Sequence, residues 1–123
     1  MNKKIIILII SILSLQMCVS PFVISDYYMV YNEYEGHRLM CKLGCDYDPF
    51  IDNVKSIKWD KKHIIVEQQE NGQTNWYLII ASGEELRCCN RDTTISFNSK
   101  LELDRLIQKK NINVKKMKEK HFK

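Results

Sequence analysis

The chain has 123 residues, and this length limits it to one small domain. Its formal net charge of +4 has three contributions: Lys3 and Lys4 add two positive charges, residues 26–104 hold 9 Lys and Arg against 14 Asp and Glu, and residues 105–123 hold 8 against 1. An acidic body therefore carries a basic C-terminal tail. The sequence contains no HExxH, GxSxG or GxxxxGK[ST] motif, which excludes the enzyme classes that those motifs define, and we predict no enzymatic activity.

Residues 1–25 have the features of an export signal or membrane anchor. Lys3 and Lys4 give a positive start, residues 5–15 are almost entirely apolar, and the first acidic residue is Asp26. Isoleucines packed this densely are poor material for a short helix in a soluble core, because their β-branched side chains disfavour helix. We therefore predict that Lys3 and Lys4 stay inside the cell and that the domain after them is exported.

The processing of this leader has three alternatives. Residues 15–18 (Leu-Gln-Met-Cys) resemble a bacterial lipobox, in which Cys18 is lipidated and becomes the new N-terminus, although Met17 stands where a small residue is usual. The second alternative is cleavage after Ser25, and the third is an uncleaved anchor over residues 5–24, a length that just spans a bilayer. We prefer a lipoprotein held in the cell envelope, with a secreted or periplasmic domain as the alternative location.

Four cysteines remain once Cys18 is assigned to the leader. An even number in a small exported domain predicts two disulfides. A bond between two adjacent cysteines would close a strained eight-membered ring, so we favour two cross-links between the 41/45 segment and the 88/89 segment, while a local bond within the first segment stays open. Free thiols and a zinc site are alternatives that the missing CxxC pair disfavours, and we predict no metal and no cofactor. The disulfide candidates are Cys41, Cys45, Cys88 and Cys89.

A hairpin over residues 63–69 and 75–80 is the clearest local prediction. The two segments flank Asn71-Gly72, a dipeptide that favours the type I′ turn. In the matching register Val66 faces Tyr77, Ile64 faces Ile79, Ile65 faces Leu78 and Glu67 faces Trp76. Both sides of this hairpin carry apolar groups, so we expect it to lie centrally in a sheet.

Other strands are predicted where β-branched and aromatic residues gather between turn signals. These strands cover residues 27–31, 37–41, 54–59 and a short last segment at 85–90, and residues 43–53 form a loop.

The C-terminal helix begins at Ser99, which forms a capping box with Glu102. Leu103, Leu106 and Ile107 follow at helical spacing, and the helix is expected to stop near Asn111. Residues 113–123 are rich in lysine and lack a periodic apolar pattern, so we predict a frayed or disordered tail. The predicted fold class is α+β: a single domain over residues 26–112, with a small antiparallel sheet of five or six strands and one C-terminal helix packed on it.

The order of these segments resembles a known family. A leader ending near a cysteine is followed by a tyrosine-rich strand, by residues 54–68 (VKSIKWDKKHIIVEQ), by residues 76–80 (WYLII) and by a capped helix. This arrangement is similar to small bacterial exported lipoproteins catalogued as domain of unknown function 3997, over most of residues 27–112. The resemblance implies an envelope location, and it supplies no activity and no site residues.

We therefore expect an exported, envelope-associated, non-enzymatic binding or structural module. Its partners would be the membrane, reached through the N-terminal segment or its lipid, and an envelope protein or cell-wall polymer. Nucleic acid is not expected, because the basic tail has no stacking aromatic apart from Phe122 and because export argues against such a partner. The alternatives are a secreted inhibitor or immunity-type protein that binds a partner enzyme, and a thiol redox protein. Candidates for contact with a membrane or another polyanion are Lys109, Lys110, Lys115, Lys116, Lys118, Lys120 and Lys123.

Overall fold

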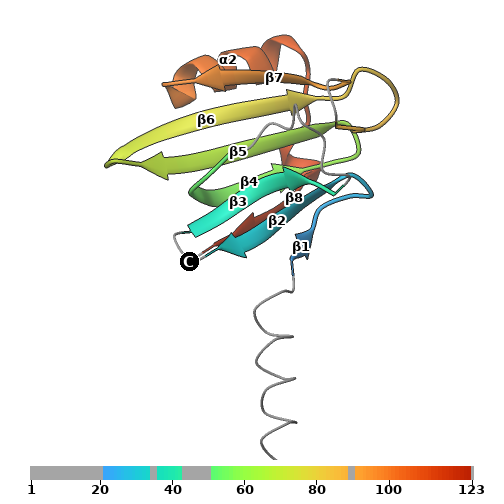
Figure 1. Ribbon diagram of the computed structural model, residues 1–123. Helices are drawn as coiled ribbons and strands as arrows, with labels where there is room; N and C mark the ends of the chain where they lie inside the picture. Colours follow the sequence, from blue (N-terminus) through green and yellow to red (C-terminus); the bar gives the residue numbers. More distant parts are fainter. Residues whose placement is uncertain (1–20, 34–35, 43–50, 89–90, 123) are drawn as a thin grey trace, which may run out of the picture.

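The computed structural model describes residues 21–33, 36–42, 51–88 and 91–122. These residues form two antiparallel sheets and one α-helix (Figure 1), which confirms the α+β class. The prediction of one sheet with five or six strands is wrong, because the strands divide into a three-stranded sheet and a five-stranded sheet.

The small sheet has the order β1-β2-β3, and the large sheet has the order β7-β6-β5-β4-β8. The strands of the small sheet are β1 (Phe22–Val23), β2 (Tyr28–Glu33) and β3 (Gly36–Cys41). Those of the large sheet are β4 (Val54–Trp59), β5 (His63–Glu70), β6 (Gln73–Ile80), β7 (Thr93–Phe97) and β8 (Lys118–His121). The helix α2 spans Lys100–Lys109, and a single 3-10 turn, η1, spans Val114–Lys116.

The β5–β6 hairpin has the predicted register. Val66 pairs with Tyr77, and Ile65 pairs with Leu78. Asn71 and Gly72 have φ values of 53° and 75°, the positive angles that a type I′ turn requires. β5 is the middle strand of its sheet, with β4 and β6 beside it, so the expected central position is confirmed.

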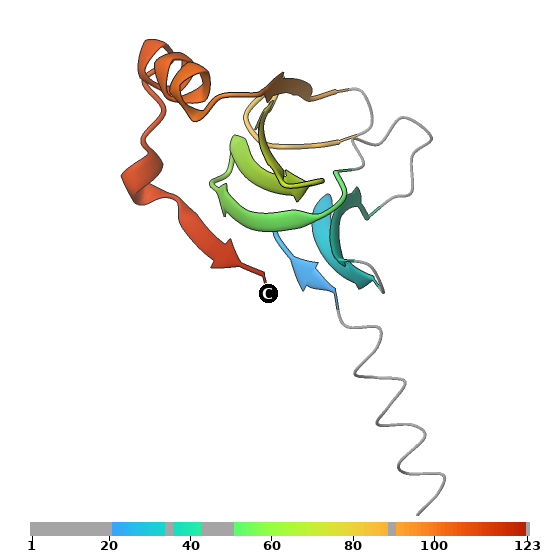
Figure 2. The ribbon, with the colours of Figure 1, turned by 90° about the vertical axis from the view of Figure 1, so that its left-hand side faces the viewer.

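Two apolar cores lie on opposite faces of the large sheet, one toward the small sheet and one toward α2, and Figure 2 shows these two elements on either side of the large sheet. Side chains alternate along β5, so Ile64 and Val66 pack toward the small sheet while Ile65 packs toward α2. The first core also contains Tyr28 and Leu39 from the small sheet. The molecule therefore has three layers, with the large sheet between the small sheet and the helix.

The helix is fixed by its ends and by one buried side chain. Ser99 is the N-cap residue, and its Oγ accepts a hydrogen bond from the Leu101 N–H at 3.2 Å. Asn111 adopts φ 55° just past the C-terminal end, where a left-handed residue ends a helix. Leu103 is 1% exposed and joins the second core. The predicted N-cap residue, stop and packing stripe are confirmed, but the Ser99 side chain bonds the Leu101 N–H and not the Glu102 N–H of the predicted capping box.

Replacing Leu103 with alanine is expected to lower the free energy of unfolding by about 3 kcal/mol, because it leaves a cavity between α2 and the sheet. The matched control is Leu101→Ala on the same helix, where a 59% exposed side chain predicts a change within about 0.5 kcal/mol. Urea unfolding followed by circular dichroism measures both. Equal midpoints for the two variants would contradict this packing.

Residues 113–122 do not form the expected disordered tail. After η1, β8 pairs in antiparallel register with β4 and covers the edge of the large sheet. All four side chains of β8 are exposed, so the strand is held by its backbone pairing and by its flanks, with Met117 against one core and Phe122 against the other. Such a strand lacks the alternation that reveals a half-buried strand in a sequence.

Two other strand predictions need correction. Glu85–Cys88, the described part of the strand predicted at 85–90, is irregular, and the strand lies at β7 instead. β7 begins with two threonines and an isoleucine, a β-branched run that is typical of a strand. β1 and the buried residue Ile24 lie in the segment that we assigned to the leader, so the folded domain starts before residue 26.

Candidate binding sites

Cys41 and Cys88 form a disulfide, with their Cα atoms 6.2 Å apart. Both cysteines are buried, at 2% and 1% exposed, and both belong to the core between the two sheets. One predicted cross-link between the 41/45 and 88/89 segments is thereby confirmed, and local pairing of Cys41 with Cys45 is wrong. Cys18, Cys45 and Cys89 lie outside the described residues, so the second cross-link and the lipidation of Cys18 stay predictions.

Asp92 holds the loop that carries Cys88. Its Oδ2 atom accepts hydrogen bonds from the Tyr28 hydroxyl at 2.8 Å, from the Arg87 N–H at 2.8 Å and from the Cys88 N–H at 2.7 Å. Cys88 adopts φ 66°, a left-handed conformation that this carboxylate stabilises by capping its N–H. No local sequence pattern indicates this role, because Tyr28 and Asp92 are 64 residues apart. The carboxylate and the disulfide together fasten the loop to the small sheet.

A basic groove lies where the start of the domain meets its last strand. It has a volume of about 390 Å³, and its walls come from the segment after β1, from the end of β4 and the turn after it, and from η1 and β8. The walls combine an indole and an isoleucine with three ammonium groups and one carboxylate. The residues that line the basic groove are Ile24, Ser25, Trp59, Asp60, Lys61, Lys116 and Lys118.

Strand pairing explains how the groove is built. Trp59 is paired with Lys118 across β4 and β8, and paired residues in an antiparallel sheet project to the same side. Phe22 packs edge-on against the Trp59 ring, with ring centroids 5.6 Å apart. The β1 strand therefore supports the indole from one side while the lysine stands beside it.

Asp60, the acidic residue of the groove, makes its hydrogen bonds within the turn that follows β4. The Oδ1 atom of Asp60 accepts hydrogen bonds from the N–H groups of Lys62 at 2.8 Å and His63 at 2.7 Å, and it lies 3.1 Å from His63 Nδ1. In the described part of the chain, none of the three groove lysines has a carboxylate within 4.0 Å. Their positive charge is therefore available to a ligand.

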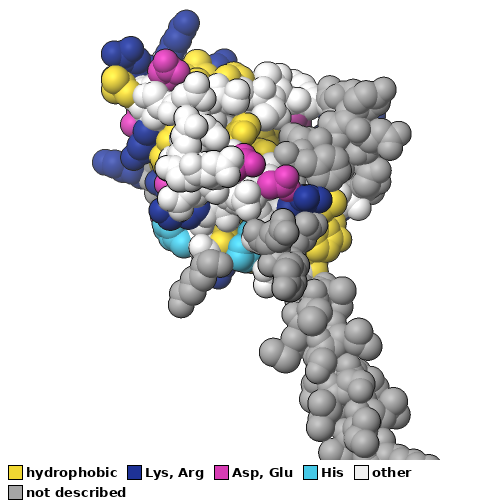
Figure 3. Space-filling model, turned by 60° about the vertical axis from the view of Figure 1, so that its left-hand side comes forward, with side chains coloured by type: hydrophobic (Ala, Val, Ile, Leu, Met, Phe, Trp, Pro, Cys, Tyr) yellow, Lys and Arg dark blue, Asp and Glu magenta, His cyan; other side chains and the backbone are white. Residues whose placement is uncertain are grey.

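The other described lysines of the predicted tail patch do not line the basic groove. Figure 3 shows Lys and Arg side chains in several separate groups on this face of the molecule. Lys109 and Lys110 are exposed at the end of α2, and Lys115 is exposed on η1. Lys120 lies over the Phe22 ring, 5.7 Å from its centroid, and Lys123 lies outside the described residues. Of the six predicted residues that the structure describes, the groove brings together only Lys116 and Lys118, and it adds Lys61, which was not among the predicted residues.

A second hollow, the helix–sheet cleft, lies between α2 and the large sheet. Its volume is about 200 Å³, below the usual range of small-molecule pockets. Its polar wall includes Ser56, whose Oγ donates a hydrogen bond to Glu67 Oε1 at 3.0 Å, and its apolar wall includes Trp76 and Leu103. We interpret it as space left beside the helix and not as a site.

Within residues 21–33, 36–42, 51–88 and 91–122, no three His, Cys, Asp or Glu side chains are placed to hold a metal ion. In the same residues no helix is long and apolar enough to cross a membrane. Comparison with protein-family models, with curated proteins and with solved structures found no match. The resemblance to the lipoprotein family of unknown function stays a prediction, and any functional proposal rests on the groove, the disulfide and the leader.

Proposed function

We propose that this protein is an exported binding module, held in the cell envelope by its N-terminal segment and without enzymatic activity of its own. The observation that carries the proposal is the buried Cys41–Cys88 disulfide, because disulfides form and persist outside the reducing cytoplasm. The apolar run at residues 5–15 is a separate feature that supports export.

The position of β1 supports a chain that keeps the residues before Asp26. Ile24 is 9% exposed and belongs to the first core, and Phe22 contacts the rings of Trp59 and Phe122. Cleavage after Ser25 would remove all of β1 and uncover these partners. A lipoprotein that begins at Cys18 retains β1, as does an uncleaved anchor. This favours a tethered protein over the secreted inhibitor, which would begin at Asp26.

The burial of the disulfide favours binding over thiol redox chemistry. A redox disulfide must be reached by the thiolate of its partner, and Cys41 and Cys88 are both almost completely enclosed. The basic groove, in contrast, is open and joins apolar and charged walls, as ligand sites do. Binding through the groove is therefore the activity that we assign to the domain.

The mass of the intact protein from its native membrane fraction tests this proposal. We expect a chain that starts at Cys18 and carries lipid, because that product keeps β1 and has a tether. Alkylation of the folded protein should leave Cys41 and Cys88 unmodified, whereas alkylation after reduction should add two labels at these positions.

Two results would contradict the proposal. A soluble chain that starts at Asp26 would remove the tether and bring forward the secreted inhibitor. Labelling of Cys41 or Cys88 without prior reduction would show accessible thiols and favour the redox protein. A membrane-bound chain that starts at Met1 would support the tether and exclude lipidation at Cys18.

A further inference from the structure

We propose that the basic groove binds the phosphate ester of an anionic phospholipid headgroup, with its uncharged glycerol part against Trp59 and Ile24. The inference rests on the proposed function, because it requires a domain tethered at a membrane, and it adds the ligand and the residues that bind it.

Three lysines from different elements meet in the basic groove. Lys61 comes from the β4–β5 turn, Lys116 from η1 and Lys118 from β8, and the three line one hollow. Like charges that converge in one place repel one another unless an anion is shared between them. Lysine ammonium groups bind phosphate well as point charges, and no carboxylate of the described residues lies within 4.0 Å of these three.

The basic groove also has an apolar wall beside its three lysines. Trp59 and Ile24 give the groove an apolar side, and the indole is held in place by Phe22. A bare inorganic anion would not use this side, whereas the carbon skeleton of glycerol would lie against it. The volume of about 390 Å³ accommodates a phosphate with a small organic part.

The segment between Cys18 and the groove is short. Ile24 and Ser25 are themselves part of the groove wall, and Cys18 lies only six residues before Ile24. A fully extended chain of six residues spans at most about 20 Å. A lipid on Cys18 would therefore hold the groove close to the headgroup layer, where anionic phosphates are concentrated.

The test uses the full-length protein in neutral maltoside micelles, with Trp76→Phe so that fluorescence reports on Trp59 alone. The micelles are doped with increasing mole fractions of phosphatidylglycerol or, in parallel, of phosphatidylcholine. We expect a saturable change in Trp59 emission with phosphatidylglycerol and none with phosphatidylcholine. Soluble glycerol 3-phosphate should compete with the lipid, whereas glycerol should not.

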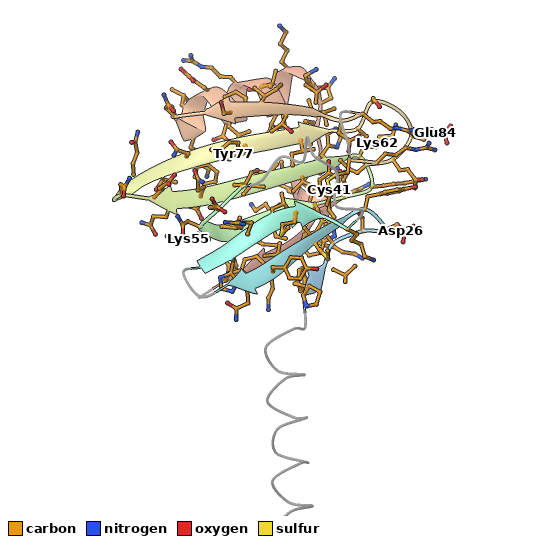
Figure 4. The ribbon with its side chains drawn as sticks, viewed as in Figure 1. Asp26, Cys41, Lys55, Lys62, Tyr77 and Glu84 are labelled. Atoms are coloured by element: carbon orange, nitrogen blue, oxygen red, sulfur yellow. A yellow bond between two sulfur atoms is a disulfide. The ribbon has the colours of Figure 1, made fainter. Side chains whose placement is uncertain are left out.

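Two triple variants of equal net charge separate the groove from general charge attraction. Lys61→Gln with Lys116→Gln and Lys118→Gln should weaken binding by roughly 100-fold, about five-fold for each lysine. The matched control carries Lys55→Gln, Lys109→Gln and Lys110→Gln, three exposed residues that do not line the groove, and should bind within about three-fold of the parent. Figure 4 places Lys55 at the opposite end of the large sheet from Lys62, the neighbour of Lys61.

Three results would overturn the inference. Equal weakening in both triples would show attraction without a site, and the absence of a saturable phosphatidylglycerol response would remove the lipid as ligand. Binding of glycerol 3-phosphate without any response to phosphatidylglycerol would assign the groove to a free phosphate ester. Each variant is first compared with the parent in thermal unfolding, and the intact mass is taken on the same preparation. A membrane-bound protein whose Trp59 emission does not respond to phosphatidylglycerol then contradicts only this inference. A chain that starts at Asp26 contradicts the proposed function.

Discussion

Replacing Cys88 with serine is expected to lower the free energy of unfolding by about 4 kcal/mol. The bond between Cys41 and Cys88 closes a loop with a sequence separation of 47, and the chain-entropy estimate for a loop of that length is about 4 kcal/mol. The loss is large for a small domain, whose whole stability is about 5–15 kcal/mol. Denaturant unfolding of the oxidised protein measures it, because the native bond forms only under oxidising conditions.

A double-mutant cycle provides the control for this result. Cys41→Ser alone should cause about the same loss as Cys88→Ser, and the double variant should cause little more, because each single change removes the same bond. Reduction of the parent protein should shift its midpoint toward that of the variants. If both single variants kept the melting temperature of the parent, the bond would contribute nothing and the structural role of the disulfide would be wrong.

Deletion of residues 117–123 is expected to lower the free energy of unfolding by about 3 kcal/mol. The deletion removes the backbone pairing of β8 with β4 and the packing of Met117 and Phe122 against the two cores. It also uncovers Phe22, whose ring centroid is 5.9 Å from that of Phe122. A disordered tail would give the opposite result, with no change in stability on deletion.

The contribution of the lysine charges of β8 to stability can be separated from that of its backbone pairing with β4. The double variant Lys118→Gln, Lys120→Gln keeps the backbone of β8 and removes two charges, one of which lies over the Phe22 ring. Exposed charges contribute little to stability, so the variant should stay within about 1 kcal/mol of the parent. Thermal unfolding compares the two proteins. If the double variant were as unstable as the deletion, the lysine charges would hold β8 in place and the backbone pairing would not.

Local patterns predicted the elements whose signals are contained in a short stretch of sequence. The β5–β6 register follows from Asn71-Gly72 and from the alternation on both sides of that turn, and the helix follows from Ser99 and the stripe headed by Leu103. β7 has a local signal as well, because it begins with two β-branched threonines. Residues 85–88, where the strand was predicted, contain no β-branched residue.

The basic groove could be predicted only in fragments. Lys116 and Lys118 were candidates because they belong to a lysine-rich tail, and Trp59 belonged to a predicted strand. Nothing in the sequence links these residues to Lys61 or Ile24, because they meet only when β8 returns to the edge of β4 and β1 reaches the same side. The site is a product of long-range pairing.

Sequence patterns alone predicted the α+β class, the central hairpin, the capped helix and a disulfide between two distant segments, and they show an apolar N-terminal run. These features depend on composition and on neighbouring residues, whose spacing is visible in one dimension. Three others appear only in the folded chain: the division into two sheets, the inclusion of β1 and β8 in the domain, and the pairing of Cys41 with Cys88. The exposed strand β8 shows the reason. Backbone hydrogen bonds can be made by almost any residue, so the sequence records the strand only weakly. Its partners in β4 are also distant in the sequence, from 59 residues between Trp59 and Lys118 to 65 residues between Ser56 and His121.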